Sequence, residues 1–316
     1  MTRHVVFGTG QVGHQLVQQL VAQGHDVVAI NRSGRGHLPG AQIVAGDATD
    51  PSFTSGACRG AAVVYFCLNA RSYDRWEEEF PPLQRAVLTG AANAGARLVA
   101  LENLYSYGPS QGRRLVETMP PSPTSRKSAT RAAMTLELLE AHAAGHASVA
   151  IGRASDYFGP GTLNSALGET VFSAAVAGKS AQVMGDPDQP HSYSYTPDVA
   201  ANLITLGASP EAAGQVWHLP VGETRSTRQI IEQVYDLAGT RGPRILAAGR
   251  GTLRALGLIR PPMREYLHTL YQFTSPWVVD DGKFRSSFGG RTTPLDDALA
   301  ATLAWYRTRA DVPAST

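Results

Sequence analysis

The sequence predicts an α/β fold in which a doubly wound parallel sheet is joined to a smaller, interwoven C-terminal lobe. In the first half of the chain, short apolar runs alternate with longer stretches whose apolar residues have helical spacing. Strands that are apolar almost throughout and separated by helices are typical of a parallel sheet covered on both faces. Beyond about Gly152 this alternation fades, and segments rich in Gly, Pro and aromatic residues indicate a second lobe.

Six short apolar runs predict the strands. They are His4–Phe7, Asp26–Ile30, Gln42–Ala45, Ala61–Leu68, Arg97–Leu101 and Ser148–Ile151. Three of the intervening stretches predict helices. They are Gln11–Gln23, Pro82–Asn93 and Thr124–Ala143. A glycine follows each of them closely, as is common where a helix ends.

Composition and charge exclude several classes of protein. The 316 residues carry a formal net charge of +2, with 17% charged and 43% apolar residues, so no strong basic field points to nucleic acid. The two cysteines, Cys58 and Cys67, lie in no metal-ligand pattern, and we expect neither a disulfide framework nor a metal site. A first strand that begins by His4 leaves no room for a signal peptide, and no run reaches membrane-spanning length. We therefore expect a cytoplasmic protein with neither a nucleic-acid nor a membrane partner.

A glycine-rich run connects the first predicted strand to the first predicted helix. It reads Gly8, Thr9, Gly10, Gln11, Val12, Gly13 and has the spacing GxGxxG. Gly8 permits a tight turn, Gly10 lets the backbone approach a pyrophosphate, and Gly13 lets the helix pack on the strand. The position between a strand and a helix predicts a dinucleotide site of the Rossmann type. The alternative is a glycine-rich turn without a ligand.

The residues after the second strand favour NADP(H) over NAD(H). An NAD-selective site has an acidic residue there, which accepts hydrogen bonds from the ribose 2′-hydroxyl, but this chain has Asn31, Arg32 and Ser33. Asp26 stands at the other end of the strand, so Arg32 is free to pair with a 2′-phosphate, assisted by Ser33. The alternative is that Arg32 belongs to a solvated basic turn.

Turns after the third and fourth strands extend this site. Asp47, followed by Ala48, is placed to hold the adenine amino group, and Leu68, Asn69 and Ala70 are placed to pass along the cofactor. We expect residues 1–160 to form the NADP(H)-binding domain, with a strand and a helix returning to it around residues 181–220. Residues 161–316 then form mainly the substrate-binding lobe.

With these features the chain resembles the extended short-chain dehydrogenase/reductases, the NAD(P)-dependent epimerase/dehydratases. The separated motifs that carry the resemblance occur in the family's order. Besides the glycine loop they are Leu104-Tyr105-Ser106-Tyr107-Gly108-Pro109, Arg153-Ala154-Ser155-Asp156-Tyr157-Phe158-Gly159-Pro160-Gly161 and Tyr195-Thr196-Pro197-Asp198-Val199-Ala200. The match extends into the last part of the chain, through Asp281 to Lys283 and Trp305 to Arg307.

The family's catalytic pair is missing, so the resemblance implies an atypical member. In the family a Tyr and a Lys four residues later share one helix face, and a Ser or Thr ends the fifth strand. Here Lys127 stands in the Tyr position, Arg131 in the Lys position and Asn103 in the strand position. By analogy Arg131 binds the nicotinamide ribose, and Asn103 binds a substrate oxygen.

A replacement proton donor is needed if the protein is catalytic. Lys127 is a candidate if burial and Arg131 depress its pKa, and Tyr105 and Tyr107 are others. A solvated role for Lys127 and a packing role for Tyr107 are the alternatives. Tyr157 and Tyr193 are more remote candidates. Among the histidines, His191 is the most cleft-like candidate for a substrate contact, and an ordinary surface position is the alternative.

Three functions remain open at the level of sequence. The leading interpretation is an NADP(H)-dependent oxidoreductase that transfers hydride to or from a carbonyl, alcohol or activated double bond of a small organic molecule. The second is a non-catalytic NADP(H)-binding redox sensor or scaffold, and the third is a nucleotide-sugar epimerase or dehydratase. The resemblance also implies a possible homodimer, formed through the helices Pro82–Asn93 and Thr124–Ala143.

Overall fold

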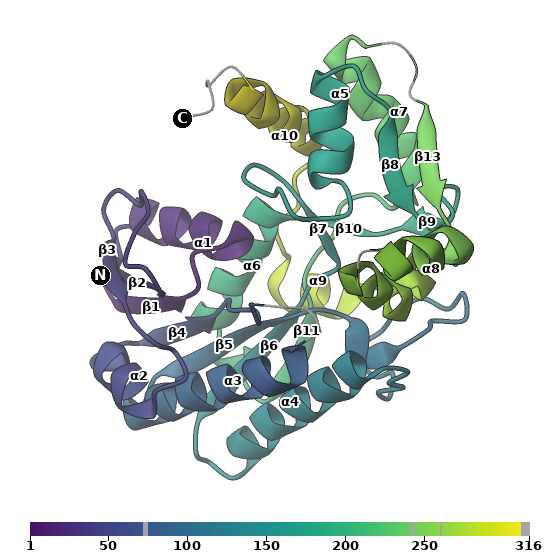
Figure 1. Ribbon diagram of the computed structural model, residues 1–316. Helices are drawn as coiled ribbons and strands as arrows, with labels where there is room; N and C mark the ends of the chain where they lie inside the picture. The colour runs from purple at the N-terminus through teal and green to yellow at the C-terminus, as the bar shows by residue number, and fades with distance from the viewer. Residues whose placement is uncertain (72–74, 241, 243, 260, 311–316) are drawn as a thin grey trace.

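A parallel sheet of seven strands forms the centre of the molecule (Figure 1). The computed structural model describes residues 1–71, 75–240, 242, 244–259 and 261–310. The strand order is β3-β2-β1-β4-β5-β6-β11, and every neighbouring pair is parallel. The strands are β1 Arg3–Phe7, β2 Asp26–Asn31, β3 Gln42–Ala45, β4 Val63–Phe66, β5 Arg97–Glu102, β6 Ser148–Arg153 and β11 Gln215–His218. The predicted fold class and its six strands are confirmed, and β11 is the seventh strand of the sheet.

Helices cover both faces of the sheet because successive strand residues point to opposite sides. Val5 and Phe7 of β1 belong to one buried cluster, whereas Val6 between them belongs to the other. On the first face lie α2 (Pro51–Cys58), α3 (Trp76–Asn93) and α4 (Arg126–Ala143). On the second lie α1 (Gln11–Ala22), α6 (Thr196–Ala208) and α9 (Gly282–Phe288).

Helix α3 begins at Trp76, so the expectation that it begins at Pro82 is wrong. Pro81 and Pro82 both lie inside it, and each removes one backbone hydrogen bond. The first turns form nevertheless because Trp76 and Phe80 are buried against the sheet, being 2% and 1% exposed. Three glutamates in the first turn also suit the positive end of the helix dipole.

A smaller lobe stands over the carboxyl ends of the strands and has its own buried core. Its principal elements are the parallel pair β8 (Ala181–Met184) and β13 (Ile245–Ala248), with η2 (Gly168–Ser173), α5 (Ala174–Val176), α7 (Thr227–Ala238), α8 (Arg250–Ile259) and α10 (Leu295–Ala310). The remaining short elements are η1 (Tyr105–Tyr107), β7 (Asp156–Phe158), β9 (Pro190–His191), β10 (Tyr193–Tyr195), η3 (Pro210–Ala212), β12 (Arg225–Ser226), η4 (Pro261–His268) and η5 (Leu270–Phe273). The two parts are interwoven: within 181–220, α6 and β11 pack on the sheet domain, while β8 belongs to the lobe.

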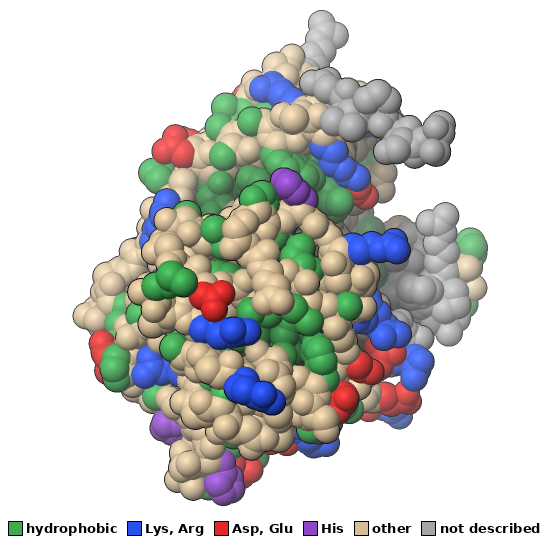
Figure 2. All heavy atoms as spheres, turned by 90° about the vertical axis from the view of Figure 1, so that its left-hand side faces the viewer, with side chains coloured by type: hydrophobic (Ala, Val, Ile, Leu, Met, Phe, Trp, Pro, Cys, Tyr) green, Lys and Arg blue, Asp and Glu red, His purple; other side chains and the backbone are tan. Residues whose placement is uncertain are grey.

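The surface over β3 and α1 carries charges of both signs. Figure 2 shows basic and acidic side chains scattered over this face without gathering into a large patch of one sign. No helix in the described part of the chain is long and apolar enough to span a membrane. Nor do three or more His, Cys, Asp or Glu side chains, among those described, form a group suited to a metal ion.

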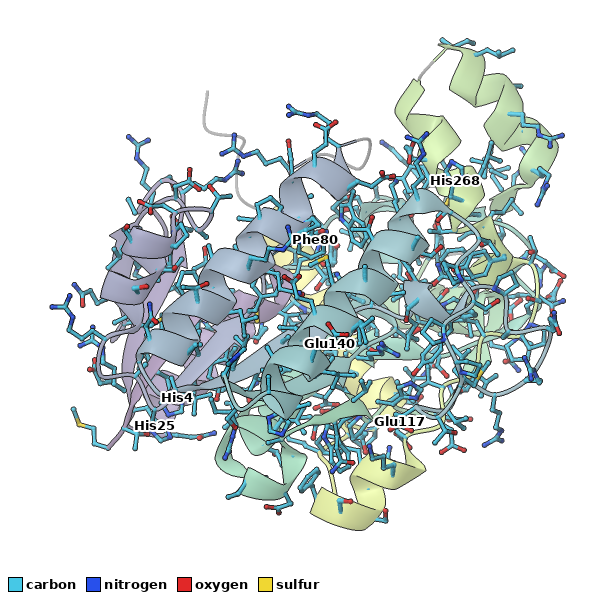
Figure 3. All side chains as sticks on the ribbon, turned by 90° about the horizontal axis from the view of Figure 1, so that it is seen from below. His4, His25, Phe80, Glu117, Glu140 and His268 are labelled. Carbon is cyan, nitrogen blue, oxygen red and sulfur yellow. The ribbon has the colours of Figure 1, made fainter. Side chains whose placement is uncertain are left out.

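Two histidines lie side by side at the amino ends of β1 and β2, far from the glycine loop (Figure 3). The ring centroids of His4 and His25 are 4.3 Å apart, and the Thr2 hydroxyl lies 2.9 Å from a nitrogen of each ring. His4 also stacks on Tyr65 and is 6% exposed. Burial, followed by the proximity of His25, lowers the pKa of His4 to about 4.

Acid should therefore destabilise the fold through His4. Between about pH 6.5 and pH 4, His4 is protonated in the unfolded chain but stays neutral in the folded chain. The free energy of unfolding therefore falls as pH falls, by up to about 1.4 kcal/mol per pH unit. Between pH 7 and pH 4.5, urea unfolding should show a smaller loss of unfolding free energy for His4→Phe than for wild type. The control His146→Gln, at an exposed position, should lose as much as wild type. Equal losses in wild type and His4→Phe would contradict this origin of the acid sensitivity.

Candidate functional site

The glycine loop after β1 has the geometry of a phosphate cradle. Gly8 has φ +101°, and a Cβ atom there would lie 2.6 Å from the Cys67 carbonyl oxygen. A Cβ at Gly13 would lie 1.8 Å from the Gly8 carbonyl oxygen, whereas one at Gly10 would have nothing within 4 Å. Two glycines are thus needed for packing, and Gly10, the N-cap of α1, borders open space. An anion can approach the helix N-terminus there.

Asn31 shapes the turn that presents Arg32. Its side-chain oxygen accepts hydrogen bonds from the Ser33 and Gly34 amides, and its amide nitrogen donates to the Thr9 hydroxyl at 3.0 Å and to the Arg35 carbonyl. Arg32 itself is exposed and lines the cleft described below. The arrangement leaves a guanidinium at the end of β2, where the sequence predicted one.

Asp47 follows β3 at the same edge of the sheet. Its carboxylate accepts hydrogen bonds from the Thr49 amide at 2.9 Å and the Thr49 hydroxyl at 2.7 Å. These bonds, the backbone one first, lower the pKa of Asp47, and the more distant charge of Arg71 acts in the same direction. Asp47 is therefore held ionised as an acceptor at the rim of the cleft.

A cleft of about 1760 Å³ runs from the glycine loop, along the carboxyl ends of the strands, to the small lobe. It collects most of the residues that the sequence singled out. These are Gly8, Thr9, Gly10, Gln11, Val12, Asn31, Arg32, Asp47, Ala48, Leu68, Asn69, Asn103, Tyr105 and Arg131. Gly13 packs beneath the loop, and Ser33 and Ala70 belong to turns at its border.

Arg131 projects from α4 to the wall of the cleft and is 2% exposed. Its guanidinium packs against the rings of both Trp76 and Phe80, with its central carbon 5.2 and 4.6 Å from their centroids. Within the described structure, its Nε and Nη1 have no hydrogen-bond partner. Burial lowers the pKa of Arg131, but a guanidinium stays charged at neutral pH. A buried cation with unsatisfied N–H groups beside a cleft is suited to a bound polar ligand.

Glu102 is a site residue that the sequence interpretation missed. It ends β5, is 1% exposed, and accepts hydrogen bonds from Arg153 Nε at 3.1 Å and from the Thr135 hydroxyl at 2.9 Å. One of its oxygens lies 3.7 Å from Arg131 Nη1. An acidic residue at the end of an otherwise apolar strand was the available signal, since a buried carboxylate needs cationic partners.

Arg153 connects this cluster to Tyr107 and, through it, to His218 of the edge strand β11. Its guanidinium lies 4.7 Å above the ring of Tyr107, whose hydroxyl is 2.8 Å from His218 Nε2. Burial raises the pKa of Tyr107, which is 1% exposed. Tyr107 is therefore a packing residue under the turn, as the alternative interpretation had it.

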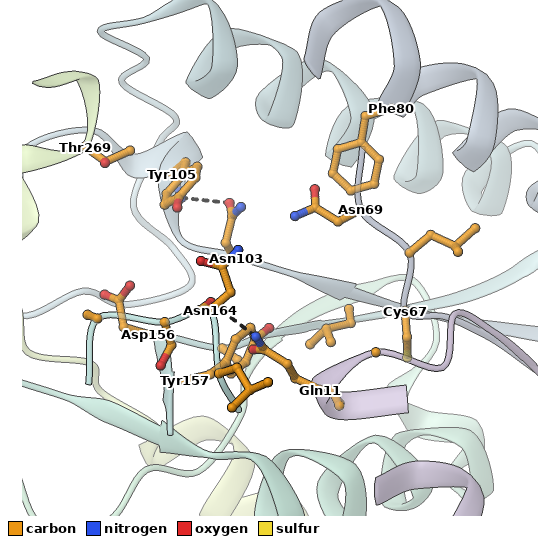
Figure 4. A pocket seen from close by; sticks show the side chains of 18 of the residues that line it. Gln11, Cys67, Asn69, Phe80, Asn103, Tyr105, Asp156, Tyr157, Asn164 and Thr269 are labelled. Atoms are coloured by element: carbon orange, nitrogen blue, oxygen red, sulfur yellow. Dashed lines mark hydrogen bonds between the residues drawn. The ribbon is translucent and has the colours of Figure 1, made fainter. Parts of the chain in front are cut away.

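Asn103 and Tyr105 stand in the middle of the cleft (Figure 4). The Asn103 side-chain oxygen accepts a hydrogen bond from the Tyr105 amide at 3.1 Å, which leaves its amide nitrogen as a donor. Asp156 and Tyr157 lie across the cleft from Tyr105 and Thr269. Tyr105 and Tyr157 are both close enough to Arg131 for their charges to interact.

Lys127 lies elsewhere. Its ammonium forms an ion pair with Glu265 at 2.5 Å and is 6% exposed. The two residues line a separate cavity of about 300 Å³. The helix carrying Lys127 thus turns it toward η4, while Arg131, one turn later, reaches the main cleft.

A family model links these features to known proteins. The model described as the NAD dependent epimerase/dehydratase family matches residues 5–222. The chain belongs to this family. A comparison with curated protein sequences finds no significant match. The family match confirms the resemblance found in the sequence. At the level of the family, it also confirms the oxidoreductase-like, NAD(P)-binding character that the resemblance implied.

Solved structures of sugar-nucleotide enzymes share the fold over nearly the whole chain. A dTDP-glucose 4,6-dehydratase from Bacillus anthracis, in complex with NAD, has a TM-score of 0.79 and 15% identity, covering 98% of this chain and 97% of its own. A UDP-N-acetylglucosamine 4-epimerase from Methanobrevibacter ruminantium, in complex with UDP-N-acetylmuramic acid, has a TM-score of 0.80 and 17% identity, covering 98% and 99%. A UDP-glucuronic acid 4-epimerase from Bacillus cereus with NAD has a TM-score of 0.78, 17% identity and the same coverage. At such identities the likeness concerns the fold.

The glycine loop yields a prediction that separates packing from binding. Gly13→Ala should destabilise the protein severely because its Cβ would overlap the Gly8 carbonyl. Gly10→Ala should fold, at a cost below about 1 kcal/mol, yet bind NADPH at least tenfold more weakly, because its methyl group would occupy the space for the pyrophosphate. Urea unfolding and fluorescence titration measure the two effects. Gly56→Ala, in α2 and also without neighbours within 4 Å, is the control; unchanged NADPH binding by Gly10→Ala would refute the cradle.

Proposed function

We propose that the protein is an NADP(H)-dependent oxidoreductase that acts on a carbonyl, alcohol or activated double bond of a small organic molecule. The observation that carries the proposal is one continuous cleft. It begins at the glycine loop, passes the unsatisfied guanidinium of Arg131, and opens beside Asn103 and Tyr105. A dinucleotide along this path would have its pyrophosphate at Gly10 and its nicotinamide ribose at Arg131.

The residues around the cleft fit the cofactor. Gly10 borders open space at a helix N-terminus, and Arg32 stands where a 2′-phosphate would be bound. Arg131 offers buried N–H groups to ribose hydroxyls. When bound, the nicotinamide would supply or accept the hydride. The fold relatives were solved with NAD, so the preference for NADP(H) rests on Arg32 and on the absence of an acidic residue from Asn31-Arg32-Ser33.

Asn103 would bind the substrate oxygen, and Tyr105 would protonate it. The amide nitrogen of Asn103 would donate a hydrogen bond to it, because the Asn103 oxygen already binds the Tyr105 amide. The Tyr105 hydroxyl would donate the proton as hydride reaches the carbon, and the nearby charge of Arg131 favours the phenolate left behind. Lys127 is less suited to this role because Glu265 engages it outside the cleft.

Removal of the proton donor should lower the rate without affecting cofactor binding. We expect Tyr105→Phe to reduce kcat by about 100-fold or more and to leave the Kd for NADPH within twofold, with activity measured on a panel of aldehydes, ketones and enones. Tyr235→Phe, which removes a hydroxyl bonded to the Lys179 carbonyl in the small lobe, is the matched control. If Lys127→Met abolished activity while Tyr105→Phe left kcat unchanged, the proton donor would be Lys127. No turnover by wild type, with NADPH bound normally, would favour the sensor or scaffold interpretation.

Cofactor choice should depend on Arg32. We expect NADPH to bind at least tenfold more tightly than NADH, a difference of about 1.4 kcal/mol, and Arg32→Ala to remove the difference by weakening NADPH alone. Trp fluorescence quenching at one fixed salt concentration measures both. Arg59→Ala, an exposed change just after α2, is the control. Equal binding of the two dinucleotides by wild type would overturn the NADP(H) assignment.

Epimerisation or dehydration of a nucleotide sugar is the second candidate. The family assignment and the fold shared with enzymes of that class favour it. Such an enzyme reduces and reoxidises its tightly held cofactor within one turnover. Co-purified NAD(P) together with a bound nucleotide sugar, identified by mass spectrometry of the denatured protein, would support this candidate over the first.

A further inference from the structure

The charged side chains of the cleft are divided between its two ends. At the end formed by the sheet domain, four arginines, Arg32, Arg71, Arg75 and Arg131, line it together with four carboxylates, those of Asp47, Glu78, Glu79 and Glu102. At the end formed by the small lobe, the charged lining residues among those described are Asp156 and Glu169, both acidic. Arg225 of this lobe forms ion pairs with Glu223 and Asp296 at the surface. The side chains of Arg260 and Arg264 lie outside the described residues.

Asp156 is fixed in the wall from behind. Its carboxylate lies 2.9 Å from Nε2 of His191, which is 2% exposed, and Nδ1 of the same ring lies 3.2 Å from the Gln272 carbonyl oxygen. The His191 ring stacks on Phe273 with the planes 4° apart. His191 is thus a buried support and not the surface residue that a lone loop histidine suggests. It holds Asp156 at the lobe end of the cleft (Figure 4).

Much of the remaining wall at this end is apolar. The parallel pair of β8 and β13 contributes Val183, Met184 and Leu246, and α8 and η5 add Leu253 and Phe273. Glu169 stands at the exposed rim, where Arg309 pairs with it at 3.1 Å. Uncharged polar side chains, among them Asn164, Gln182 and Thr252, complete this wall. Among the described residues, the lobe end therefore presents a mixed apolar and uncharged polar surface with one fixed carboxylate.

A nucleoside diphosphate would meet no cationic side chain among the described lining residues of this end. Its diphosphate needs cationic or N–H partners when it leaves water, and here it would meet the Asp156 carboxylate. We propose that the small-lobe end of the cleft takes an uncharged or cationic organic substrate with an apolar body, selected by Asp156, and rejects nucleoside diphosphates. This inference rests on the proposed function for the reaction but concerns binding alone. A cationic or hydroxyl group of the substrate would contact Asp156, and its apolar body would lie against β8 and β13.

Calorimetry on the wild-type protein saturated with NADP⁺ tests the rejection directly. UDP and dTDP are the probes, and each should bind with a Kd above about 1 mM, which corresponds to less than about 4 kcal/mol of affinity. A tighter Kd for either would overturn the proposal and favour a nucleotide-sugar substrate. Because the readout is binding, a lack of hydride transfer would defeat the proposed function without affecting this result.

A matched series of probes tests the preference. Benzaldehyde, 4-carboxybenzaldehyde and 4-(dimethylaminomethyl)benzaldehyde differ mainly in charge, and NADP⁺ cannot reduce them. Competition measured by saturation-transfer NMR should show that the neutral and cationic aldehydes bind at least tenfold more tightly than the carboxylate. Asp156→Asn should lower the preference for the cation about tenfold, while Glu169→Gln, at the paired rim position, should leave it unchanged. Binding of the carboxylate as tightly as the cation, or no binding of the other two, would overturn the proposal.

Discussion

A buried carboxylate between two guanidinium groups holds the site together. Glu102, at the end of β5, contacts Arg153 of β6 directly and lies close to Arg131 of α4. All three residues are at least 96% buried, and buried charges are tolerated only when they are paired, since loss of one partner from a buried pair costs about 3–5 kcal/mol. Glu102 therefore fixes a strand, its neighbour and a helix at the point where the cleft opens, and with them the direction in which Arg131 points.

The same helix explains how this family member departs from the family's pattern. Lys127 and Arg131 are one turn apart, yet Lys127 pairs with Glu265 in a separate cavity while Arg131 reaches the main cleft. The Lys127 ammonium thus joins α4 to η4. Under the proposed function, the chemistry falls to groups on the strand side, Asn103 and Tyr105, which one short turn after β5 positions together.

Local patterns explain what the sequence could predict. The first six strands and the glycine loop are encoded in a few consecutive residues, and Arg32 and Asp47 follow from their positions at strand ends. The pairs that complete the site join residues far apart in the chain: Arg153 with Glu102, Lys127 with Glu265, and His191 with Asp156. No periodicity reports such pairs. The helix start predicted at Pro82 was wrong because proline is a strong local signal for the beginning of a helix. Burial of Trp76 and Phe80 extends the helix in front of it.

A crystal structure of the NADPH complex would test the central claim most directly, that the cleft positions a nicotinamide beside Arg131, Asn103 and Tyr105. We predict the pyrophosphate over Gly10, the 2′-phosphate against Arg32, a nicotinamide-ribose hydroxyl within hydrogen-bond distance of Arg131 Nη1, and the ring facing Tyr105. A nicotinamide directed away from Arg131 and Tyr105, or a dinucleotide bound outside the glycine loop, would contradict it.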